Sequence, residues 1–236
     1  MKVAFIHDWL VSLAGAEQVL LAMHGVWPEA PIYTSVYKKE SFPMLKNTEV
    51  IPSFIQKIPL ARSKHQMFPQ LRSVAFEQFD LSKYNVVISD GHAESKGVIT
   101  KPETMHVCYC HTPIRYYWSN YHDYIKNPRY GILNPLVKLG MPFLINYLRM
   151  WDSLAADRVD YFIANSKYVA KRIKKYYGRD STVIYPPVET ARFKPASKVK
   201  DYYFAAGRLI PYKQFDLIVE TFNDLGLPLK NCREWT

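Results

Sequence analysis

The sequence predicts a doubly wound α/β fold with a mainly parallel sheet, followed by the start of a second α/β unit. Two observations support this prediction. Short apolar runs of strand length alternate with longer segments whose apolar residues recur at helical spacing. The same alternation begins again beyond a polar connector that follows Pro187. With 48% hydrophobic and 22% charged residues, the chain of 236 residues also lies in the globular range, which excludes disordered and fibrous classes.

The expected strands are apolar runs bounded by polar or turn-forming residues, as is typical of buried parallel strands. In chain order they cover residues 2–8, 30–37, 84–92, 106–113, 161–164, 182–185, 202–206 and 227–229. Between residues 41 and 70, prolines interrupt a basic and aromatic stretch, which favours loops and short helices there.

The expected helices have apolar residues three or four positions apart. In chain order they cover residues 15–27, 93–99, 135–156, 167–177 and 214–225, and the third of these segments fits one helix or two. Gly15 begins the first helix and Pro28 stops it. Asn165 or Ser166 caps the fourth helix, which Gly178 ends.

Polar residues follow three of the predicted strands at the points where the strands end. These polar ends are His7-Asp8, Asp90-Gly91-His92 and His111-Thr112. Ligands of open α/β sheets bind beyond the carboxyl ends of the strands. We therefore expect the three polar ends to line one crevice.

The formal net charge of +10 fits an anionic partner, whether phosphates, an acidic lipid surface or nucleic acid. The chain contains no Gly-x-Gly-x-x-Gly and no phosphate loop ending in Gly-Lys-Ser/Thr. Nicotinamide-dinucleotide binding and P-loop chemistry therefore lose their main support. No nucleic-acid recognition motif accompanies the charge, so we expect no nucleic-acid partner.

The three cysteines indicate neither a disulfide framework nor a zinc site. Cys108 and Cys110 are neighbours on one predicted strand and Cys232 is far away in the sequence, so we expect buried thiols. No run approaches the about 20 apolar residues of a membrane-spanning helix, and residues 1–11 lack the features of a secretory signal. These features predict a cytoplasmic protein.

Six short motifs occur in a consistent order along the chain. They are Gly15-Ala16-Glu17, Ser89-Asp-Gly-His92-Ala-Glu-Ser-Lys96-Gly97, Cys110-His-Thr-Pro-Ile-Arg115-Tyr-Tyr-Trp118, Asn165-Ser-Lys-Tyr-Val-Ala-Lys-Arg172-Ile, Tyr185-Pro-Pro187-Val and Gly207-Arg208-Leu-Ile-Pro211-Tyr-Lys213. In this order they resemble the nucleotide-sugar glycosyltransferases of family 4, also called group 1. The third and sixth motifs look most like bacterial members that build O-antigen and exopolysaccharide, several of which are mannosyltransferases.

The resemblance implies the GT-B fold, in which two Rossmann-like domains face each other. Residues 1–188 would form a complete N-terminal, acceptor-side domain, residues 189–200 a connector, and residues 201–236 the start of the nucleotide-sugar-binding domain. The chain contains no Glu-x7-Glu stretch, which contacts the donor sugar and ribose in the family. We therefore expect a chain truncated within its second domain.

The family motifs also assign roles to residues on the donor side. Arg208 and Lys213 would hold the donor diphosphate and stabilise the departing leaving group, although isolated cations at strand ends are commonly solvated surface charges. Gly15 and Ala16 would lie beside the donor phosphates, with Ala16 in place of the second glycine that is common in the family. A simple tight turn is the alternative for these two residues.

Other residues would contact the transferred sugar or the acceptor. His111 corresponds to a histidine near the reaction centre, and a hydrogen-bonded core histidine is the alternative. Further candidates for contact with the sugar or acceptor are His92, Asp8, Arg115 and Trp118. The alternative for Asp8 is a turn-capping role. The alternative for the aromatic cluster between residues 115 and 124 is simple packing.

The basic helix face from Lys167 to Lys175 is either solvated or docked on anionic lipid.

The final residues differ from the family pattern in a specific way. Family members continue with an apolar strand and a glycine-rich turn, whereas this chain ends Lys230-Asn-Cys-Arg-Glu-Trp-Thr236. One base inserted into a run of A would convert codons for Lys-Ile-Val-Gly-Asn-Gly into this ending. We hypothesise that residues 231–236 are out of frame; a deliberate truncation is the alternative, and sequencing the gene decides between them.

Together, the motifs predict a retaining glycosyltransferase that moves a hexose such as mannose from a nucleotide-diphosphate donor to a growing, lipid-linked glycan. No cluster of residues requires a metal or another cofactor. We expect the protein in the cytoplasm, with peripheral contact at the inner face of an anionic membrane, and we expect no transfer by the truncated chain. The alternative is a non-catalytic remnant that binds acceptor or membrane.

Overall fold

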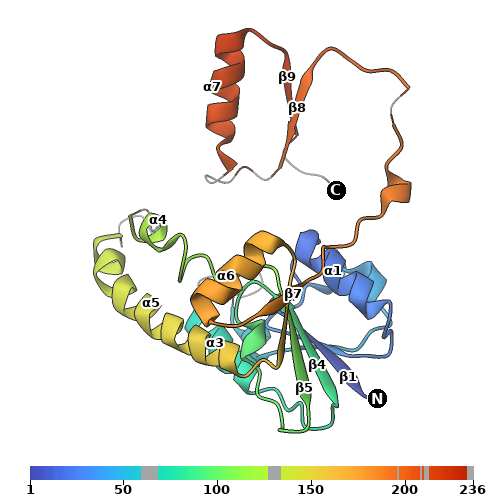
Figure 1. The fold of residues 1–236 in the computed structure, drawn as a ribbon, viewed down its shortest axis with the longest axis vertical. Coiled ribbons are helices and arrows are strands. Elements are labelled where there is room, and N and C mark those ends of the chain that lie inside the picture. Colours follow the sequence, from blue (N-terminus) through green and yellow to red (C-terminus); the bar gives the residue numbers. More distant parts are fainter. Residues whose placement is uncertain (60–68, 127–133, 196, 208, 210–212, 233–236) are drawn as a thin grey trace. The chain divides into compact units, whose positions relative to one another are not determined.

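The computed structural model describes residues 1–59, 69–126, 134–195, 197–207, 209 and 213–232 (Figure 1). The chain divides into two compact units, Met1–Pro187 and Val188–Thr236. The division falls next to the domain boundary expected from the sequence. Each unit is described below by itself.

The first unit is built on a parallel sheet, as the alternation of strands and helices predicted. Its described strands are β1 (Val3–His7), β2 (Ile32–Thr34), β3 (Val50–Pro52), β4 (Val86–Gly91), β5 (Met105–Cys110), β6 (Tyr161–Ala164) and β7 (Ser181–Val183). They lie in the order β3-β2-β1-β4-β5-β6-β7, and every neighbouring pair is parallel. The chain reverses its direction across the sheet between β1 and β4, which makes the sheet doubly wound.

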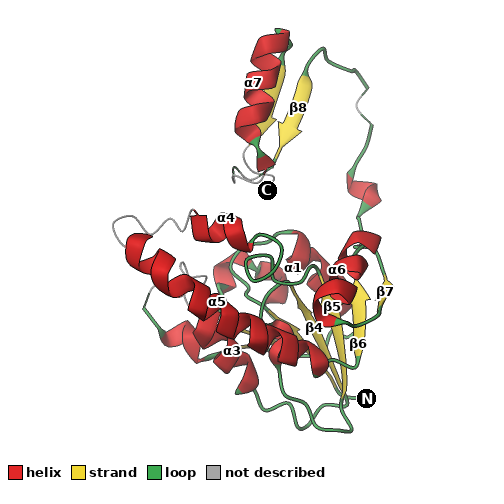
Figure 2. Ribbon diagram, turned by 60° about the vertical axis from the view of Figure 1, so that its left-hand side comes forward, coloured by secondary structure: helices red, strands yellow, loops and turns green. Residues whose placement is uncertain are grey.

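Helices cover both faces of this sheet (Figures 1 and 2). They are α1 (Gly15–His24), α3 (Pro69–Glu77), α4 (Tyr121–Lys126), α5 (Asn134–Asp157) and α6 (Lys167–Tyr177). Successive residues of β1 point to opposite faces, so Phe5 packs in the cluster that holds Leu20 of α1, and Ile6 packs with Phe76 of α3. Two buried cores, one on each face, therefore fix the ends of β1 and β4.

Helix α6 has the ends and the buried face that the sequence predicted. The Ser166 side chain accepts a hydrogen bond from the backbone N–H of Val169 at 3.2 Å, which satisfies a free donor of the first turn. Gly178 ends the helix at φ 68°, a conformation that favours glycine. Val169, Ile173 and Tyr177 are all buried.

Two predicted segments form different structures. Residues 93–99 were expected to begin a helix but contain only the 3-10 turn Ser95–Gly97, because the chain becomes extended at Val98 with ψ 153°. The Asp8 carboxylate binds the backbone N–H groups of His92, Ala93 and Ser95 at the start of this segment. The stretch expected to hold loops and short helices also contributes β3 at the edge of the sheet. Residues 135–156 belong to the single helix α5, which continues through Pro142.

The second unit contains a parallel β-α-β element. It consists of β8 (Tyr203–Ala206), α7 (Phe215–Leu225) and β9 (Leu229–Cys232), preceded by the 3-10 turn Thr190–Arg192. Gly207 has φ +155°, and a Cβ there would lie 3.3 Å from the Phe215 ring, so this strand end requires glycine. β9 extends through Asn231 and Cys232, and the rest of the segment predicted to be out of frame lies outside the described residues.

Among the described helices, none combines the length and apolar character needed to cross a membrane.

Candidate active site

The carboxyl ends of β1, β4 and β5 bring three ionisable side chains together. His7 is the last residue of β1 and pairs in register with Asp90 of β4. Gly91 pairs with Cys110 at the end of β5, so His111 directly follows the same edge. Because parallel strands end at one edge of a sheet, the polar residues that follow them meet there, as the sequence predicted.

Asp90 bridges the two histidines. Its Oδ2 lies 2.9 Å from His7 Nδ1, and its Oδ1 lies 2.8 Å from His111 Nε2. The carboxylate is fully buried. Burial alone would raise the pKa of Asp90, but the hydrogen bonds from His111 and His7 outweigh burial and leave the pKa below its usual value. Asp90 is therefore an ionised carboxylate whose two oxygens each accept one imidazole N–H.

His7 is a buried imidazolium at neutral pH. Its second ring nitrogen, Nε2, lies 3.6 Å from Oε1 of Glu17, so a carboxylate faces each side of the ring. Burial lowers the pKa of His7, but Asp90 and Glu17 raise it by more, to about 10. The carboxylates of Asp90 and Glu17 therefore both stabilise the positive charge of His7. Glu17 also accepts the Ala14 backbone N–H at 2.9 Å, so the start of α1 is attached to the same group of side chains.

His111 is fixed in place and partly exposed. Its backbone N–H donates to the Gly91 carbonyl at 3.0 Å, and its own carbonyl accepts from Asn165 Nδ2 at 3.0 Å. Only 13% of its side chain is accessible to solvent. Its Nε2 is paired with Asp90 Oδ1, so a ligand that bonds to a ring nitrogen of His111 would do so at Nδ1.

Asp8 anchors the loop that carries His92. It is buried, and its oxygens accept the backbone N–H groups of His92 at 2.7 Å, Ala93 at 2.9 Å and Ser95 at 2.9 Å. His92 is more exposed than His111 and stands edge-on to the Trp9 ring. Burial, the largest cause, lowers the pKa of His92, so its ring is neutral. Asp8 therefore positions the loop, and His92 is the member of this pair that reaches solvent.

The turn between β4 and this loop leaves no room for a side chain at Gly91. A Cβ there would lie 2.2 Å from Ser95 Oγ and 2.6 Å from Asp8 Oδ2. We expect Gly91→Ala to lower the free energy of unfolding by about 1–3 kcal/mol, as measured by urea denaturation. Gly15→Ala is the matched control, because a Cβ there meets nothing within 4 Å. Equal stabilities of the two variants would contradict the expectation.

The family comparison bears on this site directly. The model of Glycosyltransferase Family 4 matches residues 13–192, which is most of the chain. The chain belongs to glycosyltransferase family 4. The solved structure of Anabaena Alr3699/HepE in complex with UDP is similar, with a TM-score of 0.57 and 14% sequence identity over 95% of this chain. The comparison with curated proteins finds no match to this sequence.

The similarity to Alr3699/HepE shows the fold alone, since the sequences are 14% identical. This family 4 chain spans 58% of the length of the solved protein.

The glycine motif of this family 4 chain lies at the start of α1. Gly15 is the first residue of the helix and is exposed, and Ala16 follows it half-buried. The contact between Glu17 and His7 places this helix start at the end of β1, within the first unit. The role of Gly15 and Ala16 beside the donor phosphates stays a prediction.

Trp118 belongs to a different cluster. Its Nε1 donates to Asp152 Oδ2 at 2.7 Å, and its ring stacks on Tyr176 with centroids 5.1 Å apart. Arg115 is half-buried in the loop after β5, where its carbonyl accepts the Asn120 N–H at 2.8 Å. Trp118 thus contacts α5 and α6, and its role as a sugar or acceptor contact stays a prediction.

The donor-side cations lie in the second unit. Lys213 is exposed and immediately precedes Gln214, the N-terminal cap of α7. Arg208 lies outside the described residues. The role of both as diphosphate ligands stays a prediction.

Sequence reasoning placed His7 and Asp90 among the polar strand ends of the crevice, but it gave His7 little weight and assigned no binding role to Asp90 or Glu17. The signal was present, because Asp90 and His7 end predicted strands and Glu17 follows the glycine motif. The decisive fact is the register between β1 and β4, which sets His7 opposite Asp90. Within the described part of the chain, no three His, Cys, Asp or Glu side chains are arranged to hold a metal ion.

Proposed function

We propose that the protein is the acceptor-side part of a retaining glycosyltransferase that moves a hexose, with mannose as the first candidate, from a nucleotide-diphosphate sugar to a lipid-linked glycan in surface polysaccharide synthesis. The observation that carries the proposal is the Asp90 bridge at the sheet edge of a family 4 chain. It fixes His111 where ligands of such sheets bind. The UDP held by Alr3699/HepE supports a nucleotide sugar as the donor class.

The proposed role of each residue in the reaction follows from its chemistry. In the reaction the bond between the sugar C1 and the diphosphate oxygen breaks, and a bond between C1 and an acceptor oxygen forms on the same face of the ring. The acceptor proton leaves with the diphosphate. His111 positions the sugar, while Arg208, Lys213 and the start of α1 stabilise the charge that develops on the diphosphate. No metal or other cofactor has a role in this scheme.

The proposal places the protein in the cytoplasm, where nucleotide sugars are available, and against the inner face of the membrane that holds a lipid-linked acceptor. The excess of 31 Lys and Arg over 21 Asp and Glu favours contact with an anionic surface.

Donor binding tests the proposal. We expect GDP-mannose, UDP-glucose or UDP-galactose to show saturation-transfer NMR signals with the purified chain, and we expect Lys213→Ala to remove the signals of the nucleotide. Lys198→Ala is the matched control, because Lys198 is exposed in the connector of the same unit. If none of the three donors binds, the proposed function is wrong.

Donor binding, and not sugar transfer by this chain alone, separates the proposal from a non-catalytic alternative. The 236 residues contain no Glu-x7-Glu stretch, so we expect no radiolabelled hexose to enter a lipid-linked acceptor fraction with this chain alone. Measurable transfer would contradict that expectation. Binding of the acceptor fraction or of membranes, with no donor bound, would instead favour an acceptor- or membrane-binding remnant.

A further inference from the structure

His92 stands at the sheet edge with its backbone fixed and its ring partly exposed. Its backbone N–H donates to Asp8 Oδ2 at 2.7 Å, its Nδ1 lies 3.5 Å from the same oxygen, and 36% of its side chain is accessible to solvent. The Trp9 ring lies against the imidazole, with centroids 4.9 Å apart and planes at 84°. Asp8 therefore holds the backbone of residue 92, and Trp9 limits how its side chain can turn.

Trp9 is itself held by a residue behind the site. It is partly buried, and it packs against an apolar cluster that contains Val36. The guanidinium carbon of Arg72 lies 5.3 Å from the centroid of the Trp9 ring, within the range of a cation–π contact. A change at Arg72 can therefore reach His92 through Trp9.

Arg72 is fixed in turn by a buried ion pair. It comes from α3 and is 1% exposed, and its Nε and Nη2 donate to the two carboxylate oxygens of Glu94 at 2.7 and 3.0 Å. Nη2 also donates to Tyr116 Oη at 3.0 Å, and Glu94 accepts from Tyr117 Oη at 3.1 Å. A planar guanidinium that is held by two parallel hydrogen bonds has one fixed orientation against the Trp9 ring.

The stability of the fold alone does not account for this ion pair. Replacing a buried ion pair by apolar residues of similar volume is often neutral or stabilising. The pair lies among α3, the loop after β4 and the loop after β5, which it joins through Arg72, Glu94 and Tyr116. These loops follow the carboxyl ends of the strands, where ligands of such sheets bind. The positions that the pair fixes therefore explain it better than the stability that it adds.

We propose that Arg72, supported by Glu94, is a positioning residue that acts through Trp9 to hold the His92 ring in one orientation at the sheet edge. A ring that is already held loses less conformational entropy when a ligand binds to it than a ring that turns freely. The role of His92 toward a sugar hydroxyl rests on the proposed function, whereas the contacts that lead from Arg72 to His92 do not.

The motion of the histidine rings tests this positioning. In protein labelled with ¹³C at histidine Cε1, NMR relaxation gives an order parameter for each of the seven rings, and His92→Gln assigns the signal of His92. We expect the double variant Arg72→Met/Glu94→Gln to lower the order parameter of His92, because Trp9 loses its support while no unpaired buried charge is left. Trp9→Leu should lower it at least as much, since the ring contact itself is removed.

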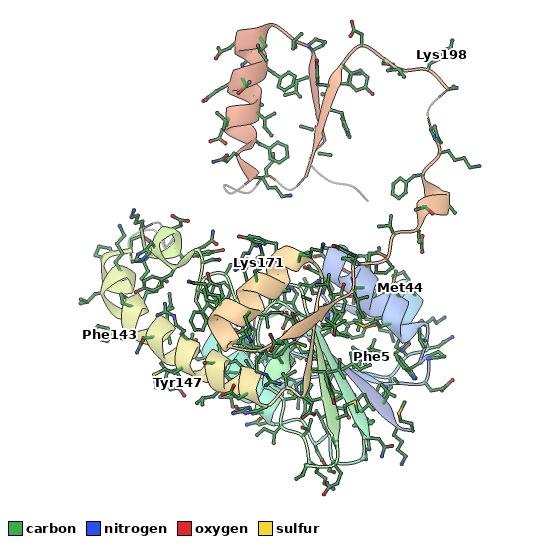
Figure 3. The ribbon with its side chains drawn as sticks, in the orientation of Figure 1. Phe5, Met44, Phe143, Tyr147, Lys171 and Lys198 are labelled. Carbon is green, nitrogen blue, oxygen red and sulfur yellow. The ribbon has the colours of Figure 1, made fainter. Side chains whose placement is uncertain are left out.

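Two matched controls should leave the His92 ring as it is in the wild type. Arg158→Met/Glu77→Gln removes another ion pair of α3, in which the nitrogen and oxygen are 2.7 Å apart. Phe143→Leu removes an aromatic ring that is 77% exposed on the outer side of α5, away from the sheet (Figure 3). Thermal unfolding verifies that each variant is folded.

Binding of GDP-mannose distinguishes a failure of this inference from a failure of the proposed function. We expect His92→Gln to weaken binding roughly fivefold, which corresponds to one hydrogen bond. Arg72→Met/Glu94→Gln should weaken binding by a similar or smaller factor, and adding His92→Gln to it should cause no further full loss. If GDP-mannose does not bind at all, the proposed function is wrong, and the order parameters still decide on the positioning.

Three results would overturn the inference. The first is an unchanged order parameter of His92 in Arg72→Met/Glu94→Gln. The second is an equal fall of that order parameter in Arg158→Met/Glu77→Gln, which would mean that any lost ion pair of α3 loosens the ring. The third is a loss of donor binding that adds in full when His92→Gln is combined with Arg72→Met/Glu94→Gln, because Arg72 would then act independently of His92.

Discussion

Replacing Asp152 by Ala is expected to lower the free energy of unfolding by about 3–5 kcal/mol. Asp152 is fully buried and is the partner of the buried Lys96 ammonium. It also accepts hydrogen bonds from Trp118 Nε1 at 2.7 Å and Tyr177 Oη at 2.9 Å. Burial lowers the pKa of Lys96, but Asp152 raises it by more, so removing the carboxylate leaves an unpaired buried charge.

Urea denaturation measures the loss of stability. Two further variants test whether the loss comes from the Lys96–Asp152 pair. Asp157→Ala changes an exposed carboxylate of the same helix and should alter stability by less than about 0.5 kcal/mol. The double variant Lys96→Met/Asp152→Ala removes both charges and should recover part of the loss. A loss below about 1 kcal/mol for Asp152→Ala, or no recovery in the double variant, would show that the pair does not hold α5 against the Ser95–Gly97 turn.

Replacing Asp90 by Asn is expected to cost about 3–5 kcal/mol at neutral pH, and the cost should shrink as the pH rises. His7 has a pKa of about 10 in the folded protein, against an ordinary value of 6.5. Folding therefore favours its protonated form. The stability that this contributes is complete below pH 6.5 and is lost as the pH rises through about 10.

In Asp90→Asn the main carboxylate partner of His7 is gone, so the pKa of His7 should fall toward its ordinary value. The stability difference between wild type and variant should then narrow by up to about 1.4 kcal/mol per pH unit between those two pH values. Denaturation at a series of pH values measures it, and ¹⁵N NMR titration of the histidines reports the pKa itself. Asp80→Asn, an exposed carboxylate, is the control. A pH-independent difference would contradict the charge assignment of His7.

The sequence predicted the parts of the fold that depend on local pattern. Alternating apolar runs and helical spacing predicted the doubly wound sheet, and Ser166 and Gly178 gave the ends of α6 correctly. The expected helix at residues 93–99 was wrong, because the chain becomes extended at Val98 after a single 3-10 turn. The start of this segment is bound to Asp8, a residue more than eighty positions earlier, and a contact over that distance is not visible in a local pattern.

The candidate site, like the fold, was predicted only where it depends on local pattern and simple topology. That the polar ends of the strands meet at one edge followed from parallel topology alone. That Asp90 lies between His7 and His111 depends on the strand order and register, which no single segment encodes. Trp118, a candidate from the aromatic cluster, donates to Asp152 of α5, a pairing that local sequence does not predict. Contacts between elements far apart in the sequence therefore determine which polar residues lie together.

The three backbone hydrogen bonds to Asp8 have a consequence for the proposed function. They tether residues 92, 93 and 95 to the residue that follows β1, so this segment of the sheet edge is held at three points. Under the proposed function, a segment held in this way would select sugars by shape, and exchanging side chains such as His92 would be the way to change which sugar is accepted.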